Sequence, residues 1–323
     1  MKWKKLGKIF DPTQVEGRPW CHEFAQCTSV LDTGENHLRV YFSSRPKRDA
    51  EGNCVSYTSF LDLDKNDLFK IVRVAKSPVL ELGELGTFDE FGVYPTCVTR
   101  IPKFGNLPVL YYAGWTRRVS TFASVSIGLA ISNDESGSSF TRVGKGPILT
   151  NSLHEPFVIS GPKVRTYKGK NYMFYLAGEK WLKVNGRSEV IYKIRLATSE
   201  LDDGINWSKL DINLVPPILE INECQAGPDV FFYDGKYHMY FSYRYGLDFR
   251  SANRGYRIGY AYSWDLINWT RDDESSGISL SSSGWDSTDM HYPHIFEVNG
   301  NYCMLYNGNE FGKHGFGLAM MEQ

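Results

Sequence analysis

The sequence predicts an all-β protein, a five-bladed β-propeller of four-stranded antiparallel blades, with residues 1–323 forming a single domain. Three observations lead to this prediction. One pattern occurs five times along the chain, each copy carries strand and hairpin signals, and no long helical periodicity interrupts the copies. A small antiparallel sheet repeated at a fixed period is the sequence signature of a propeller.

The N-terminal stretch KWKKLGKIF, residues 2–10, is predicted to close the ring. The last copy begins near Pro293, and after its second strand only KHGFGLAMMEQ remains, which is one strand where the pattern requires two. We therefore expect residues 2–10 to supply the missing outer strand of that last blade.

The first and second strands of each blade are predicted from five similar stretches. Each has an extended segment, a glycine-containing turn and a strand rich in Tyr, Phe and Met; they cover residues 27–45, 95–115, 161–181, 227–246 and 292–310. Pro95, Pro162, Pro228 and Pro293, the register prolines, mark the same place in four copies, at spacings of 67, 66 and 65 residues. Turns such as Asp234-Gly235 are strong hairpin signals, and strands that are apolar on both faces indicate burial on both sides.

The third strand and the turn to the fourth are predicted from a second recurrent phrase. An apolar strand ends in serine, an acidic turn follows and an aromatic residue closes it, at residues 124–143, 192–210 and 255–270. Two β-sandwiches remain the alternative architecture.

Composition restricts the class of function. Lys plus Arg number 36 and Asp plus Glu 37, which argues against a general binder of nucleic acids or membrane surfaces. No signal-peptide pattern or membrane-spanning stretch is visible. The six cysteines lack metal-site or disulfide spacing and indicate free thiols, with Cys27, Cys97 and Cys303 buried, so a cytoplasmic location is expected. No cofactor fingerprint is visible, and no metal is predicted.

Carboxylates precede the first strand of every predicted blade, and these segments should meet at one mouth of the central channel. They are Glu23, Asp89, Glu90, Glu155, Glu223, Asp286 and Asp289. Several carboxylates in one concave mouth would shift each other's pKa values, which is the condition for acid–base chemistry. The alternative is that these loops are simply polar.

The stretch YAYSWDLINWT, residues 260–270, is similar to the Ser-x-Asp-Leu-x-x-Trp blade edge of a known superfamily. Across its whole length the chain resembles the five-bladed propeller glycosidases of glycoside hydrolase families 43, 32, 62 and 130. The resemblance implies a base or nucleophile in the first blade, an assisting Asp in the second and a Glu acid in the third.

The matching places hold Glu23, where the family has Asp, then Asp89 or Glu90, and Glu155. The pair Glu223-Cys224 is similar to the Glu-Cys of family 32, although it falls in the fourth blade. The acid therefore stays open between Glu155 and Glu223, and the base between Glu23 and Glu90.

Basic and aromatic residues near the same mouth suggest the ligand. Besides Asp89 and Asp289, the predicted substrate-binding residues are Arg45, Trp115, Arg117, Lys180, Arg244, His291 and His294. Arginines here indicate an anionic sugar, a sugar phosphate or inorganic phosphate, unless they only pair with the carboxylates. The first hypothesis is a glycoside hydrolase-like enzyme; the alternatives are a glycoside phosphorylase and a non-catalytic carbohydrate-binding propeller, and neither nucleic acid nor membrane is an expected partner.

Overall fold

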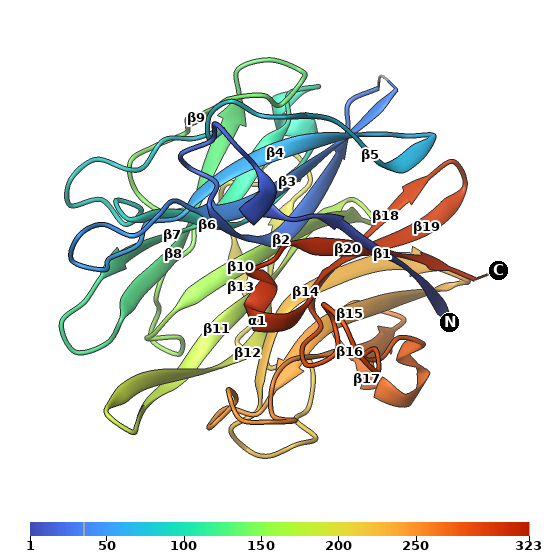
Figure 1. Ribbon diagram of the computed structural model, residues 1–323. Helices are drawn as coiled ribbons and strands as arrows, with labels where there is room; N and C mark the ends of the chain where they lie inside the picture. The colour runs from blue at the N-terminus through green and yellow to red at the C-terminus, as the bar shows by residue number, and fades with distance from the viewer. Residues whose placement is uncertain (35, 323) are drawn as a thin grey trace.

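The computed structural model describes residues 1–34 and 36–322 as five antiparallel sheets of four strands, arranged as the blades of a propeller (Figure 1). The first strands of the blades contact one another in a closed ring around the central channel. The predicted fold class is confirmed.

The five blades follow one another along the chain. The first blade contains β2 (Glu23–Asp32), β3 (His37–Arg45), β4 (Tyr57–Asp64) and β5 (Asp67–Val74). The second contains β6 (Gly92–Thr99), β7 (Val109–Arg117), β8 (Ala123–Ser132) and β9 (Phe140–Arg142). The third contains β10 (Ile159–Tyr167), β11 (Lys170–Val184), β12 (Arg187–Glu200) and β13 (Ser208–Lys209).

The fourth blade contains β14 (Cys224–Tyr233), β15 (Lys236–Arg244), β16 (Arg257–Ser263) and β17 (Thr270–Arg271). The fifth contains β18 (His291–Val298), β19 (Asn301–Asn307), β20 (Phe316–Met321) and β1 (Trp3–Phe10). Short helical turns lie between strands: η1 (Pro12–Gln14), η2 (Pro102–Phe104), η3 (Asp273–Ser276) and α1 (Asn309–Gly312).

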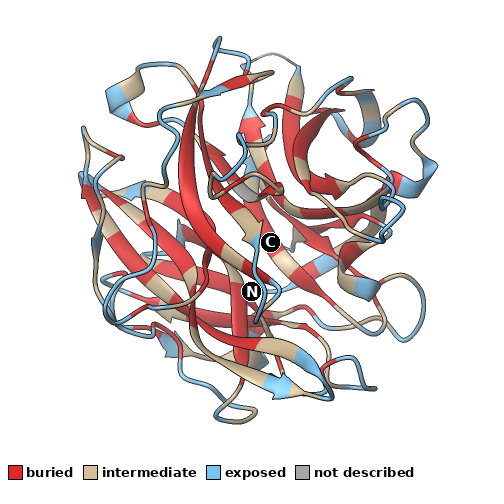
Figure 2. Ribbon diagram, turned by 90° about the vertical axis from the view of Figure 1, so that its left-hand side faces the viewer, coloured by how far each residue is buried: buried red, intermediate tan, exposed pale blue. Residues whose placement is uncertain are grey.

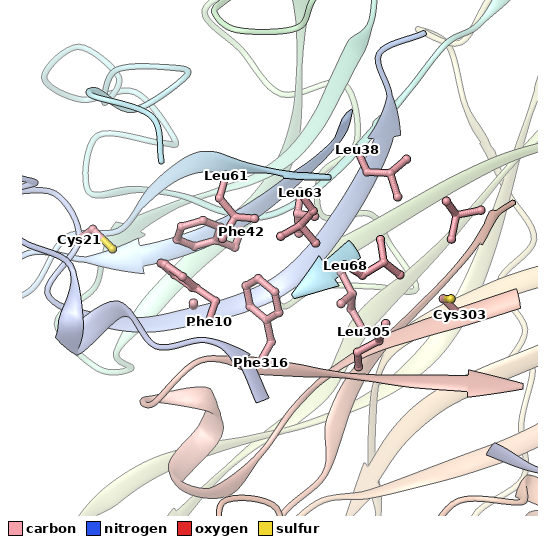
Figure 3. Close-up of a cluster of buried hydrophobic side chains, with 14 of the residues drawn as sticks. Phe10, Cys21, Leu38, Phe42, Leu61, Leu63, Leu68, Cys303, Leu305 and Phe316 are labelled. Atoms are coloured by element: carbon pink, nitrogen blue, oxygen red, sulfur yellow. The ribbon is translucent and has the colours of Figure 1, made fainter. Parts of the chain in front are cut away.

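The ring is closed by the N-terminal strand, as predicted. Strand β1 pairs antiparallel with β20, from Trp3 opposite Met321 to Phe10 opposite Phe316. Figure 3 shows the seam between the fifth and first blades, where Phe10 packs against Phe42 and Phe316 with ring centroids 5.0 and 5.6 Å apart. The seam unites segments from both ends of the chain in one apolar cluster.

Third strands are followed by turns whose acidic residue binds backbone amides, which explains the recurrent phrase. Asp265 accepts hydrogen bonds from the amides of Ile267 and Asn268 at 2.9 and 2.7 Å. The closing aromatic then packs on the second strand of the preceding blade: Trp269 lies against Phe174 at 6.1 Å. Phe140 on Tyr41 and Trp207 on Tyr111 repeat this contact. The phrase therefore joins neighbouring blades.

Burial follows the blade pattern, with buried residues along the strands and exposed residues in the connecting loops (Figure 2). All six cysteines lie in described residues and are free. Cys97 and Cys303 are buried, as predicted, whereas Cys27 is only partly buried, because it faces the cavity at the channel mouth.

Candidate functional site

Four carboxylates that precede first strands are bound within their own blades. Each is buried, and each pairs with a basic residue of its blade's outermost strand. We call them the clamp carboxylates; the pairs are Asp89 with Arg142 at 2.7 Å, Glu155 with Lys209 at 2.5 Å, Glu223 with Arg271 at 2.6 Å and Asp286 with Lys5 at 2.8 Å.

The second strand completes most of these clamps. The hydroxyls of Tyr112, Tyr175 and Tyr306 donate to Asp89, Glu155 and Asp286 at 2.9, 2.8 and 3.0 Å. In the fourth blade Phe241 occupies the corresponding position, and Glu223 instead accepts from the amides of Ile218 and Leu219 at 2.9 and 3.0 Å and from Gln225 at 2.8 Å.

This placement corrects the predicted meeting of catalytic carboxylates in the channel. Glu155 and Glu223, the two candidates for the acid, are held by different blades and are outside the cavity lining. Glu23 begins β2, half-buried and paired in register with Arg45, and is also outside the lining. Glu90 accepts hydrogen bonds from Thr116 at 2.5 Å and from the Gly86 amide at 2.8 Å, which hold the pKa of its carboxyl below the ordinary value.

A cavity of about 480 Å³ nevertheless occupies the channel mouth, lined by residues of all five blades. A β-bulge in every first strand forms its floor. In four blades a lining residue at the bulge has a positive φ: Cys27 at 55°, Gly161 at 61°, Gly227 at 55° and Tyr292 at 52°. Bulges redirect side chains, and here they turn the backbone before each register proline into the cavity.

The cavity contains more positive than negative side chains. Its basic residues are Arg45, Lys163, Arg244 and Arg250, and Glu189 is the one acidic residue among the described lining residues. Glu189 lies near the tip of the long β11–β12 hairpin, on the β12 side, and binds Arg250 at 2.8 Å. The predicted arrangement of two carboxylates facing across a pocket is not found among these lining residues.

Arg244 is the most buried of the lining arginines. Its guanidinium donates to the Tyr245 carbonyl at 2.8 Å and the Tyr192 hydroxyl at 3.0 Å, and it stacks on Phe249 at 3.6 Å. Its Nε has no hydrogen-bond partner, and no described carboxylate pairs with it. The Tyr192 hydroxyl is also hydrogen-bonded to that of Tyr256. The Arg244 guanidinium and these two hydroxyls therefore lie together in one part of the cavity wall.

The other predicted binding residues divide into two groups. Arg45 and Trp115 line the cavity, with Arg45 stacked on Phe24 at 4.2 Å and the Trp115 indole donating to Ser56 at 2.7 Å. Outside the lining are Asp89, Arg117, Lys180, Asp289, His291 and His294. Arg117 stacks on Phe91 at 4.1 Å instead.

The two histidines and Asp289 lie beneath or behind the cavity wall. Asp289 accepts from the amide of Tyr256 at 2.8 Å, and burial raises its pKa. His291 is fully buried against Tyr256 and Tyr292, and burial lowers its pKa to about 3. Burial, with the nearby charge of Lys163, lowers the pKa of His294 to about 4, so both histidines are neutral near pH 7.

Lys163 is a cavity residue that the sequence reasoning missed, although the sequence contains a signal for it. Three titratable residues, Lys163, Asp229 and His294, directly follow register prolines. The structure gathers them at the centre of the ring: His294 lies 2.7 Å from Asp229 and 3.0 Å from Lys163. The predicted catalytic carboxylates lie before or at the start of the first strands, whereas the residues that line the cavity gather around the bulges.

The described residues contain neither a metal cluster nor a membrane-spanning helix. No group of three or more His, Cys, Asp or Glu side chains in this part of the chain could hold a metal ion. Within the same residues, no helix has the length and apolar character needed to cross a membrane.

Solved structures of similar fold include glycoside hydrolases. One described as "Glycoside hydrolase" superimposes with a TM-score of 0.73 at 14% identity, covering 99% of this chain and 93% of the other. A structure from work on the GH130 family of mannoside phosphorylases gives a TM-score of 0.69 at 15% identity, covering 99% and 93%. A thermostable family-43 glycoside hydrolase gives 0.66 at 15%, covering 92% and 88%. These likenesses establish the five-bladed fold of the propeller glycoside hydrolases.

No protein-family model matches the sequence. Two curated proteins of Mycobacterium tuberculosis, "Uncharacterized protein MT1551" of strain CDC 1551 / Oshkosh and "Uncharacterized protein Rv1502" of strain ATCC 25618 / H37Rv, are each 32% identical over 322 residues, covering 100% of both proteins. The chain therefore belongs to the family of five-bladed propeller proteins that includes MT1551 and Rv1502 of Mycobacterium tuberculosis.

Proposed function

We propose that the chain binds a carbohydrate carrying an acidic group, a carboxylate or a phosphate, in the channel-mouth cavity. The observation that carries this proposal is the state of Arg244, a buried guanidinium with an unpartnered Nε and no described carboxylate beside it. A buried charge without a counter-charge is costly, and a bound oxyanion would supply the missing partner. Arginine suits this role because its planar donors match carboxylate and phosphate oxygens.

The remaining walls suit a sugar ring. Trp115, Phe122, Tyr256, Phe249 and Phe311 contribute aromatic side chains to the lining. Ligand pockets commonly combine such apolar walls with a few placed polar groups, within volumes of roughly 300–1,000 Å³. The glycosidase fold of the structural neighbours supports a carbohydrate as the ligand.

Calorimetric titration with glucuronic acid, glucose and galacturonic acid tests this proposal. We expect the acidic sugars to bind and neutral glucose to bind at least ten-fold more weakly. Arg244→Met should lower the affinity for the acidic sugars by about 10- to 100-fold, because a hydrogen bond to a charged group contributes about 1.5–3 kcal/mol.

Arg254→Met is the matched control, since Arg254 lies in the loop after β15, the strand that ends at Arg244, but stacks on Tyr245 and lies outside the cavity lining. It should bind acidic sugars as the wild-type protein does. Equal affinity of the wild-type protein and Arg244→Met for every acidic sugar in the panel would contradict the role of Arg244.

Glu189, the one carboxylate among the described lining residues, favours a second candidate function, phosphorolysis of a glycosidic bond. Hydrolysis requires a pair of carboxyl groups across the bond, whereas attack by phosphate requires one acid beside a phosphate-binding group. In this reaction a phosphate oxygen bonds to the anomeric carbon, the glycosidic C–O bond breaks, and Glu189 gives its proton to the leaving oxygen. A proton from the phosphate then restores Glu189.

Release of nitrophenol from aryl glycosides, with and without added inorganic phosphate, tests the second candidate. We expect phosphate-dependent turnover that falls by roughly 10²–10⁴ in Glu189→Gln, because the transferable proton is lost. Glu200→Gln, at the exposed far end of β12, is the control. Unchanged turnover in Glu189→Gln would exclude Glu189 as the acid while leaving the binding proposal intact.

A further inference from the structure

Lys163 lies at the floor of the cavity, with its ammonium group lacking acceptors. The residue is about nine-tenths buried, with 6% of its surface exposed, and it lines the cavity. The nearest carboxylate oxygen is on Asp229, at 3.9 Å from its Nζ, which is too far for a hydrogen bond. The nearest nitrogen, Nδ1 of His294, is at 3.0 Å.

Asp229 cannot serve as the hydrogen-bonding partner of Lys163, because its oxygens are already occupied. One oxygen accepts from Arg165 at 2.6 Å and from the Val230 amide at 3.0 Å. The other faces Nδ1 of His294 at 2.7 Å and accepts from the Ile295 amide at 2.8 Å. A carboxylate has about four acceptor sites, and these four donors fill them.

His294 does not serve Lys163 either. The amide of Val30 donates to its Nε2 at 2.8 Å, so in the neutral ring the hydrogen is on Nδ1 and points to Asp229. With His294 neutral, the cluster contains two cations, Lys163 and Arg165, and one anion, Asp229. One positive charge is left over, and Lys163 is the cation that faces the cavity.

A second unmatched group lies in the same lining. The Thr28 hydroxyl is buried and has no hydrogen-bond partner, although it can donate one hydrogen bond and accept two. Thr28 lies two residues before Val30, whose amide donates to Nε2 of His294, the histidine that lies 3.0 Å from Lys163. Both unmatched groups therefore belong to the cavity floor.

We propose that Lys163 and Thr28 form an oxyanion subsite on the cavity floor, separate from Arg244, that takes a phosphoryl group. This rests on the proposed function in that the same cavity holds the carbohydrate. The subsite is occupied either by free phosphate beside the sugar or by a phosphate carried on the sugar. In both cases the anion balances the surplus charge of the Lys163–Arg165–Asp229 cluster and accepts hydrogen bonds from Lys163 and Thr28.

Titration calorimetry with inorganic phosphate and with glucuronic acid separates the two sites. The wild-type protein should bind phosphate, and Lys163→Met should bind it at least ten-fold more weakly while keeping glucuronic acid affinity within about three-fold. Thr28→Val, which keeps the side-chain shape, should weaken phosphate binding by a smaller factor. Lys168→Met, in the exposed β10–β11 turn of the same blade, is the control and should bind both probes as the wild-type protein does.

Two results would overturn the subsite while the proposed function stands. In one, Lys163→Met binds phosphate as tightly as the wild-type protein does. In the other, the wild-type protein binds glucuronic acid but does not bind phosphate. Phosphate binding without any acidic sugar binding would reject the proposed function and keep the subsite. Thermal unfolding checks the fold: because Lys163→Met removes a surplus buried charge, its unfolding temperature without ligand should be no lower than that of the wild-type protein.

The source of the phosphoryl group is decided by competition. If the phosphate is free, phosphate and glucuronic acid should bind together, each leaving the affinity of the other unchanged or improved. If it is carried on the sugar, glucose 1-phosphate should displace both probes, and its affinity should fall in both Lys163→Met and Arg244→Met. A sugar phosphate whose affinity is unaffected by Lys163→Met would also count against the subsite.

Discussion

At the scale of single residues, the chain uses its buried charges in two different ways. Each clamp carboxylate has a cation of its own blade beside it: Glu155 lies 2.5 Å from Lys209 and 3.7 Å from Arg195, and it accepts a hydrogen bond from the Tyr175 hydroxyl at 2.8 Å. Arg244 and Lys163, in contrast, are buried with donors that find no acceptor. Matched charges hold a blade together, whereas unmatched ones are expected at a binding site, because their cost is recovered only when a ligand arrives.

Removing one partner of a clamp should destabilise the protein strongly. Lys209→Met leaves the Glu155 carboxylate buried with only the more distant Arg195 as a cation, and we expect a loss of about 3 kcal/mol in the free energy of unfolding. Urea denaturation monitored by tryptophan fluorescence measures it. Lys145→Met breaks an ion pair whose partners are 75% and 69% exposed, and should cost no more than about 1 kcal/mol. Similar losses of unfolding free energy in both variants would show that the buried clamp pairs contribute no more to stability than an exposed ion pair does.

At the scale of elements, the bulged first strand determines which residues reach the cavity. In β14 the register shifts between Ala226 and Asp229, and Gly227 has a φ of 55°. The side chain of Asp229 consequently lies among the inner charges, while Glu223, just before the strand, remains with Arg271 on the outer strand β17. The bulge therefore separates the structural carboxylate from the residues that face the channel.

Gly227→Ala should disturb both the strand and the cavity. A left-handed conformation costs a residue with a Cβ about 1–2 kcal/mol, and a Cβ at this position would be 2.9 Å from Cδ1 of Tyr292. Gly235→Ala is the matched control, since Gly235 also has a positive φ, 77°, but has open space around it. We expect a larger loss of thermal stability in Gly227→Ala, and weaker binding of acidic sugars in that variant alone. Equal losses with unchanged binding would contradict a role of the bulge in shaping the cavity.

At the scale of the whole molecule, the ring depends on contacts between its two ends. Strand β1 supplies the last strand of the fifth blade, and the Trp3 indole donates to the Tyr240 hydroxyl of the fourth blade at 2.8 Å. Lys5, also in β1, binds Asp286 at 2.8 Å and Ser281 at 2.9 Å. The N-terminal strand thus joins the final blade through backbone pairing, aromatic packing and a buried charge pair.

The Lys5–Asp286 pair makes closure sensitive to acid. Burial has the largest single effect on the pKa of Asp286 and would raise it, but hydrogen bonds from Lys5, Ser281 and Tyr306, together with the charge of Lys5, outweigh burial, and the pKa is lowered. Stability from a lowered pKa is present above the unfolded value, near 3.9, and is lost as pH falls through the folded value. At pH 7, urea denaturation of Asp286→Asn should therefore give a free energy of unfolding about 1.5–3 kcal/mol lower than that of the wild-type protein. This difference in the free energy of unfolding should shrink below pH 4. A difference that stays constant down to pH 2.5 would show that the charge is not responsible.

The fold could be predicted from the sequence because each feature that defines a blade is local. Three features set the backbone conformation within a few residues of their own position. They are hairpin turns such as Asp234-Gly235, the Asp265 turn with its closing aromatic residue, and the register prolines. The short last copy likewise required an outside strand, and only residues 2–10 were left to supply it. The same reasoning placed Arg45, Trp115 and Arg244 at the channel mouth, and all three line the cavity.

The tertiary structure alone decided which charges face the cavity. Glu223 and Arg271 are 48 residues apart, and Glu155 and Lys209 are separated by three strands, so their pairing depends on how the sheet folds across the blade. A bulge shifts the register by one residue, and in a strand one residue reverses the direction of the side chain. Lys163 follows the bulge within β10 and lines the cavity, whereas Glu155 precedes β10 and is bound by Lys209 of the outer strand, although both lie close to Pro162 in the sequence.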